Sequence, residues 1–516
     1  MASLLLTTFT ATLAILLSLL VVLLFKQSRK HKGLKLPPGP PGWPIVGNLF
    51  QVAFSGKLFM HYVRDLRKEY GPIFTLRMGV RTLIIISNAE LAHEALIEKG
   101  QLFASRPAEN KTRNIFSCNK FTVNSSTYGP EWRSLRRNMV SGMLSNSRLR
   151  EFRPARNCAM DRFIERLRSE AAASSDGASV WVLRNARFAV FCILLCMTFG
   201  ILDLDEEEIV HIDAVMKRVL LIIGARMDDY LPFLRLFFIR QHAKAVAVRR
   251  EQMETLVPLI NRRRKFLRSP STDSAEAQAQ APFSYLDSLI DLRVEGRDSA
   301  PSDSELVTLC SEFINGGTDT TATAIEWAMA RIIESPSIQD RIHEEITAHV
   351  DKSRPVDEKD TENMPYLQAF VKELLRRHPP TYFSLTHAAT QPNAQLSGYD
   401  IPTDANLDIF LATISDDPKL WARPMEFDPD RFLTGGEAAD MTGSGGIRMI
   451  PFGAGRRICP GLGMGTTHIA LMVARMVQAF EWQAHPSQPE MDFKDNFDFT
   501  VVMKRPLLAM IKPRNY

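Results

Sequence analysis

The chain has 516 residues, of which 45% are hydrophobic and 23% are charged. These proportions are typical of a globular protein and exclude a collagen-like or wholly disordered chain. The 63 Lys and Arg residues exceed the 58 Asp and Glu residues by only five, which is too little to indicate nucleic-acid binding. The six cysteines form no CxxC pair, so neither a disulfide framework nor a zinc finger is expected.

The N-terminal residues predict a membrane anchor. Residues 4–25 carry no charge and are almost entirely apolar, and a helix of that length spans about 33 Å, enough to cross a bilayer core. Five Lys and Arg residues follow between Lys26 and Lys35. The positive-inside rule then puts the remainder of the chain in the cytosol. A cleaved signal peptide is the alternative, which is disfavoured because no positive charge precedes the run and no small-residue cleavage site follows it.

A proline-rich segment separates this anchor from the rest of the chain. Residues 36–44, LPPGPPGWP, cannot form a helix, because proline removes a donor and fixes φ. A stiff, extended spacer is therefore expected. The predicted organisation is an anchor at residues 1–26, a basic, Pro-rich hinge at 27–44 and one large domain at 45–516.

The large domain is predicted to be mainly α with a minor β portion. Residues 73–76 and 83–87 flank Gly79 and are typical of two short strands. Apolar residues at helical spacing dominate from residue 89 onward, for example in residues 161–168 and 207–223.

Other segments interrupt the helical pattern. Residues 406–411 are strand-like, whereas three segments rich in small and polar residues predict loops, at 171–179, 269–282 and 435–446. Residues 230–239 are unusually apolar for a segment that contains Pro232. They are either an interior core segment or a surface segment that enters a membrane.

One cysteine lies in a distinctive motif. Residues 452–461 are FGAGRRICPG, with the spacing FxxGxRxCxG around Cys459. The glycines allow the backbone to approach something flat and bulky, and Arg457 suits a carboxylate substituent of such a ligand. A helical run follows at residues 462–480, and a thiolate at a helix N-terminus is stabilised by the dipole and free N–H groups. Such a thiolate can ligate haem iron; a buried structural cysteine is the alternative.

A long helix carries the second feature. Ser302 and Glu305 form a capping box, and the apolar period continues to residue 333. Its middle, residues 315–321, is NGGTDTT, where each of two glycines costs about 1 kcal/mol relative to alanine. This cost is expected where a helix opens beside a cofactor, and Asp319 and Thr320 can there relay protons to dioxygen. A helix bend without chemistry is the alternative.

The ExxR spacing occurs twice and is weak by itself. Glu373 and Arg376 share one helix face, but Glu165 and Arg168 have the same spacing. Only the first pair is followed by FDPDRF, whose Arg431 could complete a buried charge network.

The spacing WxxxR also occurs twice. Trp132 and Arg136 lie in a short basic segment well before the long helix, while the other copy lies within that helix. The neighbouring Arg133 and Arg137 also suit a solvated basic face.

Together, and in this order, the anchor, hinge and motifs resemble the cytochrome P450 family, most closely its plant microsomal members. The resemblance covers essentially the whole chain. It implies a cytochrome P450 fold preceded by a single N-terminal transmembrane helix, a haem b cofactor whose iron is ligated by Cys459, and a catalytic domain at residues 45–516.

The resemblance also assigns further residues. Trp132, Arg136, His387 and Arg457 would hold the haem propionates, in a cofactor site that includes Phe452 and Gly453. Thr320 with Asp319 would be the oxygen-activating pair. Glu373, Arg376 and Arg431 would form a structural network behind the haem.

The implied activity is monooxygenation, in which one oxygen atom of O2 is inserted into an apolar substrate. No GxGxxG motif lies in a βαβ context, so electrons are expected from a partner. The resemblance implies the NADPH–cytochrome P450 reductase, docked near Arg133, Arg137 and Arg456. It also implies an endoplasmic reticulum membrane protein whose catalytic domain faces the cytosol, with a lipophilic small molecule as substrate and no nucleic acid.

The substrate is narrowed by one segment. Residues 372–387, KELLRRHPPTYFSLTH, most resemble enzymes that hydroxylate or epoxidise fatty acids within the chain for surface lipids. The predicted pocket is apolar because it includes Phe116, Phe121, Phe313, Phe383 and Phe499. Terpenoids and phenylpropanoids suit such a pocket equally. A lipid-hydroperoxide isomerase or lyase and a haem-binding sensor stay as alternatives, and Thr320 argues against both.

Overall fold

The structure is a computed structural model that describes residues 18, 31, 33–201, 204–268, 283–433 and 439–514. The predicted anchor, apart from residue 18, and the predicted loop at 269–282 lie outside the described residues. The chain divides into two compact units. The smaller unit comprises Met1–Ala108, Ala225–Arg240 and Leu385–Phe410, and the larger comprises Glu109–Gly224, Gln241–Ser384 and Leu411–Tyr516.

The smaller unit is built around a three-stranded sheet of order β1-β2-β6. Strands β1 (Ile73–Met78) and β2 (Arg81–Ile86) are antiparallel, and β2 is parallel to β6 (Ala405–Ile409), which confirms the predicted strands. Gly79 makes the β1–β2 turn with φ +58°, and a Cβ there would lie 2.1 Å from the Tyr230 carbonyl oxygen. The other elements of this unit are α2 (Leu49–Phe54), α3 (Phe59–Tyr70), α4 (Ala89–His93), η1 (Glu94–Glu98), α11 (Met227–Tyr230), η2 (Pro232–Phe238), β4 (Ala394–Leu396) and β5 (Tyr399–Ile401).

Segment 230–239 reaches the surface of the smaller unit. None of the residues of η2 is buried, and the side chains of Leu236 and Phe237 are 76% and 82% exposed. The interpretation as a core segment is therefore wrong from η2 onward. The exposure of these residues agrees with the alternative of a surface segment.

The larger unit is mainly helical. Its helices are α5 (Lys111–Ser117), α6 (Pro130–Gly142), α7 (Asn146–Glu151), α8 (Arg153–Ala173), α9 (Val182–Phe199), α10 (Glu206–Ile222), α12 (Ile239–Arg268), α14 (Tyr285–Ile290), α15 (Asp303–Glu334), α16 (Pro336–His349), α17 (Glu358–Thr361), α18 (Pro365–Arg377), α19 (Leu411–Ser415), η4 (Pro429–Phe432), η5 (Gly455–Arg457) and α20 (Leu462–Ala479). The mainly helical class with a minor β portion is confirmed. Helix α8 extends into the predicted loop at 171–179 and ends at Ala173.

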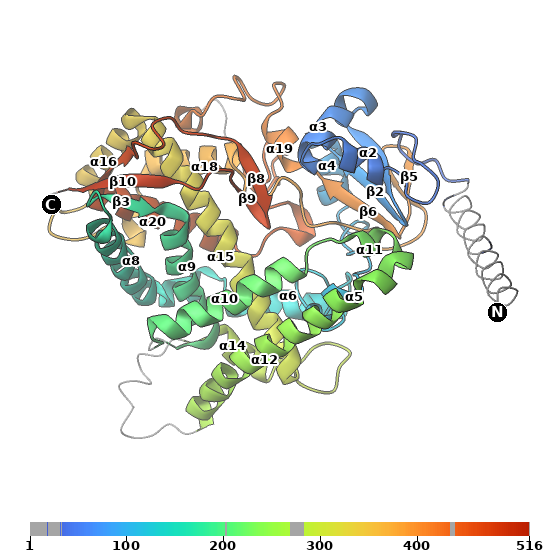
Figure 1. The fold of residues 1–516 in the computed structure, drawn as a ribbon, viewed down its shortest axis with the longest axis horizontal. Helices are drawn as coiled ribbons and strands as arrows, with labels where there is room; N and C mark the ends of the chain where they lie inside the picture. Colours follow the sequence, from blue (N-terminus) through green and yellow to red (C-terminus); the bar gives the residue numbers. More distant parts are fainter. Residues whose placement is uncertain are drawn as a thin grey trace, which may run out of the picture. The chain divides into compact units, whose positions relative to one another are not determined.

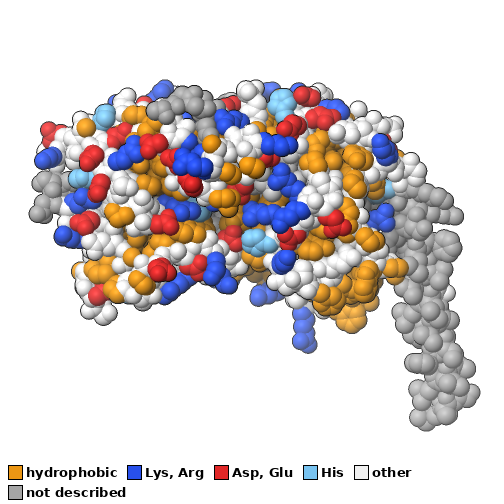
Figure 2. All heavy atoms as spheres, turned by 90° about the horizontal axis from the view of Figure 1, so that it is seen from above, with side chains coloured by type: hydrophobic (Ala, Val, Ile, Leu, Met, Phe, Trp, Pro, Cys, Tyr) orange, Lys and Arg blue, Asp and Glu red, His pale blue; other side chains and the backbone are white. Residues whose placement is uncertain are grey.

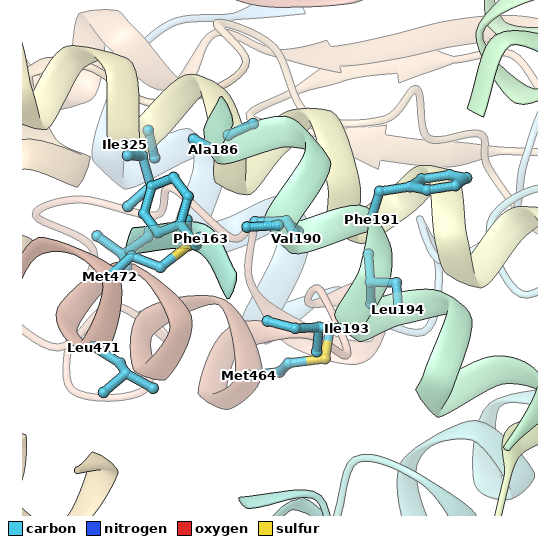
Figure 3. Packing of buried hydrophobic residues seen from close by; sticks show 14 of the residues in the cluster. Phe163, Ala186, Val190, Phe191, Ile193, Leu194, Ile325, Met464, Leu471 and Met472 are labelled. Atoms are coloured by element: carbon cyan, nitrogen blue, oxygen red, sulfur yellow. The ribbon is translucent and has the colours of Figure 1, made fainter. Parts of the chain in front are cut away.

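Helix α15 is the centre of the larger unit. Its start at the capping box of Ser302 and Glu305 is confirmed. Helix α9 runs alongside it (Figure 1), and a Cβ at Gly317 of α15 would lie only 2.9 Å from the Leu194 side chain of α9. Figure 3 shows Leu194 of α9 and Met464 of α20 in this core, and Met464 lies 3.4 Å from the same Cβ position. The close approach of α9 thus explains one of the two central glycines.

Helix α9 is apolar as well as central. In the part of the chain that the structure describes, it is the one helix long and apolar enough to cross a membrane by length and composition, and 72% of it is buried inside the protein. Burial of this extent is typical of a core helix.

Two small sheets complete the larger unit. Strands β3 (Ser179–Trp181), β10 (Leu508–Pro513) and β7 (Phe480–Ala484) form one antiparallel sheet, and β8 (Asp495–Asp498) pairs with β9 (Thr500–Met503) in a hairpin. Trp327 of α15 donates from Nε1 to the Val501 carbonyl oxygen at 2.7 Å. This hydrogen bond fixes the hairpin against the central helix. Over the face drawn in Figure 2, cationic and anionic side chains are interspersed, as expected from the small net charge.

Candidate active site

Cys459 lies in a tightly folded loop directly before α20. Its amide donates to the Phe452 carbonyl oxygen at 2.8 Å, which closes the loop. Gly453 and Gly455 have φ of +69° and +68°, in the left-handed region that favours glycine. Gly453 and Gly455 are therefore required by the backbone of this loop, whereas Gly461 has φ −87°.

The Cys459 thiol is accessible and yet enclosed. Its side chain is exposed to solvent. Burial nevertheless raises the pKa of the thiol, and the Gly461 amide and the Arg136 charge oppose that rise. Cys459 is therefore an exposed residue with two groups nearby that favour its thiolate.

Three polar side chains predicted around the cofactor lie at this loop. Arg136 of α6 donates from Nη2 to the Ile458 carbonyl oxygen at 2.6 Å. Trp132 Nε1 and Arg457 Nη1 each donate to the Val123 carbonyl oxygen at 3.1 Å. The Arg457 guanidinium also lies 4.2 Å from the centre of the Trp132 ring. The larger unit therefore brings the two cations and the indole together.

His387 belongs to the smaller unit. Its backbone pairs with Leu407 of β6, and its Nδ1 lies 2.9 Å from the Phe103 carbonyl oxygen. Only 5% of its surface is exposed. Its contact with a propionate stays a prediction.

The middle of α15 is unbroken. All residues from Asp303 to Glu334 form one α-helix, so the expected opening at the two glycines is wrong. The Thr320 hydroxyl donates to the Gly316 carbonyl oxygen at 2.9 Å while the backbone helix continues. A Cβ at Gly316 would meet nothing within 4 Å, which indicates open space on this side of α15.

Asp319 is held by an arginine from α9. Arg187 donates from Nε to Asp319 Oδ1 at 2.6 Å and also pairs with Asp213 of α10. Burial lowers the pKa of Arg187, but the two carboxylates raise it further, so that the net shift is upward. Burial raises the pKa of Asp213 despite the arginine. One guanidinium is thus shared between two acids on two helices.

The first ExxR pair forms the predicted charge network. Arg376 binds Glu373 with two hydrogen bonds of 2.7 Å, and both side chains are fully buried. Arg431 donates to the same carboxylate at 3.2 Å. In contrast, Glu165 and Arg168 are exposed and 3.5 Å apart. Burial and the contact with Arg431 therefore distinguish the first copy of the motif from the second.

The shared substrate pocket of the five aromatic residues stays a prediction, and three of them have the following surroundings. Phe116 packs in a small buried cluster with Val219, whereas Phe313 packs against Tyr285 with the rings tilted and their centres 4.9 Å apart. Phe499 is 41% exposed at the tip of the β8–β9 hairpin.

Comparison with known proteins decides the family. The family model described as cytochrome P450 matches residues 37–512. The chain belongs to the cytochrome P450 family. Cytochrome P450 89A9 of Arabidopsis thaliana is 34% identical over 93% of this chain and 94% of its own. Flavonoid 3'-monooxygenase of the same plant is 30% identical over 100% of this chain and 98% of its own. The expected family of plant cytochromes P450 is confirmed.

The fold is that of solved cytochromes P450. A zebra fish cytochrome P450 with abiraterone matches 89% of this chain and 99% of its own, with a TM-score of 0.71 and 21% identity. A second zebra fish structure, with progesterone, gives a TM-score of 0.70 at 22% identity. At these identities the likeness concerns the fold.

Cytochromes P450 are monooxygenases that carry a haem iron bound by a thiolate, and the residues at the loop fit this cofactor. Cys459 is exposed to solvent, and the Gly461 amide and the Arg136 charge favour its thiolate. A Cβ at Gly453 would meet nothing within 4 Å, so the backbone leaves room there. Arg136 and Arg457 supply two cations for acidic substituents.

Sequence reasoning missed three charged residues of this region. They are Arg187, Asp213 and Glu312, the last of which binds two backbone amides. A signal existed for one of them, because Glu312 interrupts an otherwise apolar run of the predicted long helix. Charges at such positions need buried partners.

Proposed function

We propose that this chain is a haem-thiolate monooxygenase in which Cys459 ligates the iron. The accessible, enclosed thiol of Cys459, with the Gly461 amide and Arg136 favouring its ionised form, carries the proposal. When bound, the haem supplies the activation of O2 that inserts one oxygen atom into the substrate. Trp132, Arg136, His387 and Arg457 bind its propionates, and Phe452 and Gly453 complete the site.

Asp319 and Thr320 are proposed to deliver protons. The Thr320 hydroxyl borders the open side of α15 and can turn from the Gly316 carbonyl oxygen toward a bound reactant. Asp319, one residue away and 19% exposed, can exchange protons with water. Arg187 holds this carboxylate in place.

The substrate is proposed to be a fatty acid that is hydroxylated or epoxidised within its chain. This finer proposal rests on two observations. The sequence of residues 372–387 resembles that of enzymes that oxidise fatty acids within the chain, and the segments expected around the long helix are apolar. A phenylpropanoid is a second candidate, because one relative is a flavonoid 3'-monooxygenase. A terpenoid suits an apolar site too, and turnover of a panel of all three classes with product position read by mass spectrometry decides among them.

The electron donor is proposed to be the NADPH–cytochrome P450 reductase. Arg133, Arg137 and Arg456 are exposed and belong to the same unit as Cys459, which suits docking of an acidic partner. The chain is proposed to be a single-pass protein of the endoplasmic reticulum membrane, with residues 1–26 as anchor, 27–44 as hinge and 45–516 as cytosolic catalytic domain. The exposed apolar side chains of η2 support contact with a lipid surface.

Two experiments test this function. Reduced protein with carbon monoxide should show the red-shifted Soret band of a thiolate-ligated haem, and Cys459→Ser should abolish it; an unchanged spectrum would refute the ligand. Product should form only with NADPH and reductase. Turnover of a lipid hydroperoxide without them would favour an isomerase or lyase, and haem binding without any turnover would favour a sensor.

A further inference from the structure

Glu312 lies on the same face of α15 as the residues proposed for oxygen chemistry. It precedes Gly316 by four residues and Thr320 by eight, and residues at these spacings lie above one another on a helix. The open space beside Gly316 is therefore one turn away from the Glu312 carboxylate.

The carboxylate binds the backbone of a distant segment. The amide of Val123 donates to Oε2 at 2.9 Å, and the amide of Asn124 donates to Oε1 at 2.6 Å. Each oxygen thus has its own backbone donor. These contacts fix residues 123–126, here called the tether, to the central helix.

The tether is bound on its other side by the residues proposed to hold the haem. Its Val123 carbonyl oxygen accepts from both Trp132 and Arg457, and its Ser126 carbonyl oxygen accepts from Arg457 Nη2 at 2.6 Å. The tether therefore connects α15 with the Trp132–Arg457 pair through a short run of backbone. A displacement at one end is transmitted to the other.

We propose that Glu312 is a positioning residue, which holds Trp132 and Arg457 in place through the tether and so sets how tightly the haem is retained. This inference rests on the proposed function, because it takes Trp132 and Arg457 as propionate partners. Glu312 touches neither haem nor substrate in this role. It acts by supplying two acceptor oxygens to two adjacent amides.

The hold of Glu312 on the tether depends on pH, because both of its carboxylate oxygens must accept a hydrogen bond. A protonated carboxyl group has an uncharged O–H, a weaker acceptor, in place of one carboxylate oxygen, so one of the two amides loses its charge-assisted hydrogen bond. Burial raises the pKa of Glu312 to about 7; Val123, Asn124 and Arg457 oppose this rise and Glu109 adds to it. The charge of Arg136 also interacts with Glu312, and the buried Tyr285 faces it as a neutral phenol whose pKa is raised by burial and by Glu312. The tether is therefore held most firmly above pH 7.

Glu312→Gln tests the proposal, because glutamine keeps the shape but has one acceptor oxygen. Haem transfer from the full-length holoprotein to apomyoglobin should accelerate about tenfold at pH 8, the effect of losing one charge-assisted hydrogen bond. Wild-type transfer should accelerate as pH falls from 8 to 6, whereas transfer from the variant should change little. Glu334→Gln, an exposed acid at the end of the same helix, is the matched control and should behave as wild type.

Hydrogen exchange supplies a readout of the tether itself. The peptide that contains residues 123 and 124 should exchange about tenfold faster in Glu312→Gln than in wild type, with peptides of α20 unchanged. Equal haem transfer and equal exchange in the two proteins would overturn the proposal. A wild-type protein without a thiolate-ligated Soret band would instead refute the proposed function, so the two failures are distinguishable.

Discussion

Two ion networks in the larger unit use the same residue types in different surroundings. Glu373 and Arg376 are fully buried, with Arg431 at 4% exposure. Arg187 and Asp319 are 12% and 19% exposed, and Asp213 reaches 27%. A buried ion pair cannot exchange its partners for water, whereas a partly exposed one can.

This difference in exposure indicates that the Glu373 network is a fixed scaffold, whereas the side chains of the Arg187 network can move. Arg376 also donates to the carbonyl oxygens of Ser415, Pro424 and Glu426, so its position is fixed by several chain segments. Arg187 binds two carboxylates, those of Asp213 and Asp319. If one of them is released, its negative charge can be solvated, because both carboxylates are partly exposed. Substitutions in the first network should therefore change stability, and substitutions in the second should change the reaction.

The largest effect is expected for Glu373→Gln. Loss of the charge leaves Arg376 and Arg431 without their counter-ion in the interior, which costs about 3–5 kcal/mol of the free energy of unfolding. Urea unfolding followed by tryptophan fluorescence measures it. Glu165→Gln, in the exposed copy of the motif, is the control and should unfold as wild type does. An equal loss in both variants would contradict the role of burial.

Much of the scaffold could be predicted because its motifs are local. The Cys459 loop needs only ten consecutive residues, 452–461, and two of its three glycines, Gly453 and Gly455, have a positive φ. The capping box at Ser302 likewise defines the start of α15 from adjacent positions. Local backbone requirements of this kind are written in neighbouring residues.

The second network could not be predicted, because its partners are distant in sequence. Arg187 and Asp319 are 132 positions apart, and the two amides that bind Glu312 are 188 and 189 positions from it. Such pairs depend on how helices pack, which composition does not specify. For the same reason the apolar residues of η2 were compatible with either core or surface, since composition does not say which neighbours cover a segment.

Glu326 is a buried carboxyl group that, unlike Glu373 and Asp319, has no ion-pair partner among the described residues. Glu326 of α15 is fully buried, accepts from the Leu507 amide at 3.0 Å, and forms no ion pair within the described part of the chain. Burial raises its pKa to about 7, opposed by the Leu507 and Met503 amides. The folded protein therefore binds a proton more tightly than the unfolded chain, and its stability falls as pH rises from about 4.5 to about 7.

Glu326→Gln should remove this dependence. The variant should gain about 2–3 kcal/mol relative to wild type between pH 5 and pH 8, because glutamine keeps the acceptor for Leu507 and carries no charge. Urea unfolding at the two pH values measures the difference. A constant offset between the two proteins would mean that Glu326 does not titrate in this range.

Arg187→Gln should disturb the reaction more than the fold. Without the guanidinium, Asp319 loses its partner and adopts several orientations, so delivery of protons fails more often. The fraction of NADPH diverted to hydrogen peroxide should rise. Coupled turnover should fall about tenfold, which is less than the roughly 10²–10⁴-fold contribution of a positioned proton-transfer group because Asp319 itself is retained. Haem content and the carbon monoxide spectrum should stay unchanged. A loss of haem in step with activity would instead place Arg187 in the scaffold.

Asp213→Asn should give the smallest effect and distinguishes a shared arginine from a fixed one. Removal of this carboxylate leaves Arg187 to Asp319 alone, which strengthens that pair and slows release of the acid. Exposed ion pairs are worth less than about 1 kcal/mol, so coupled turnover should fall only about twofold. The decrease should shrink at high salt, where the remaining pair is screened, because these side chains are partly accessible. If Asp213→Asn lowered coupled turnover as much as Arg187→Gln does, and if this decrease did not depend on salt, the three residues would form a rigid unit like the Glu373 network.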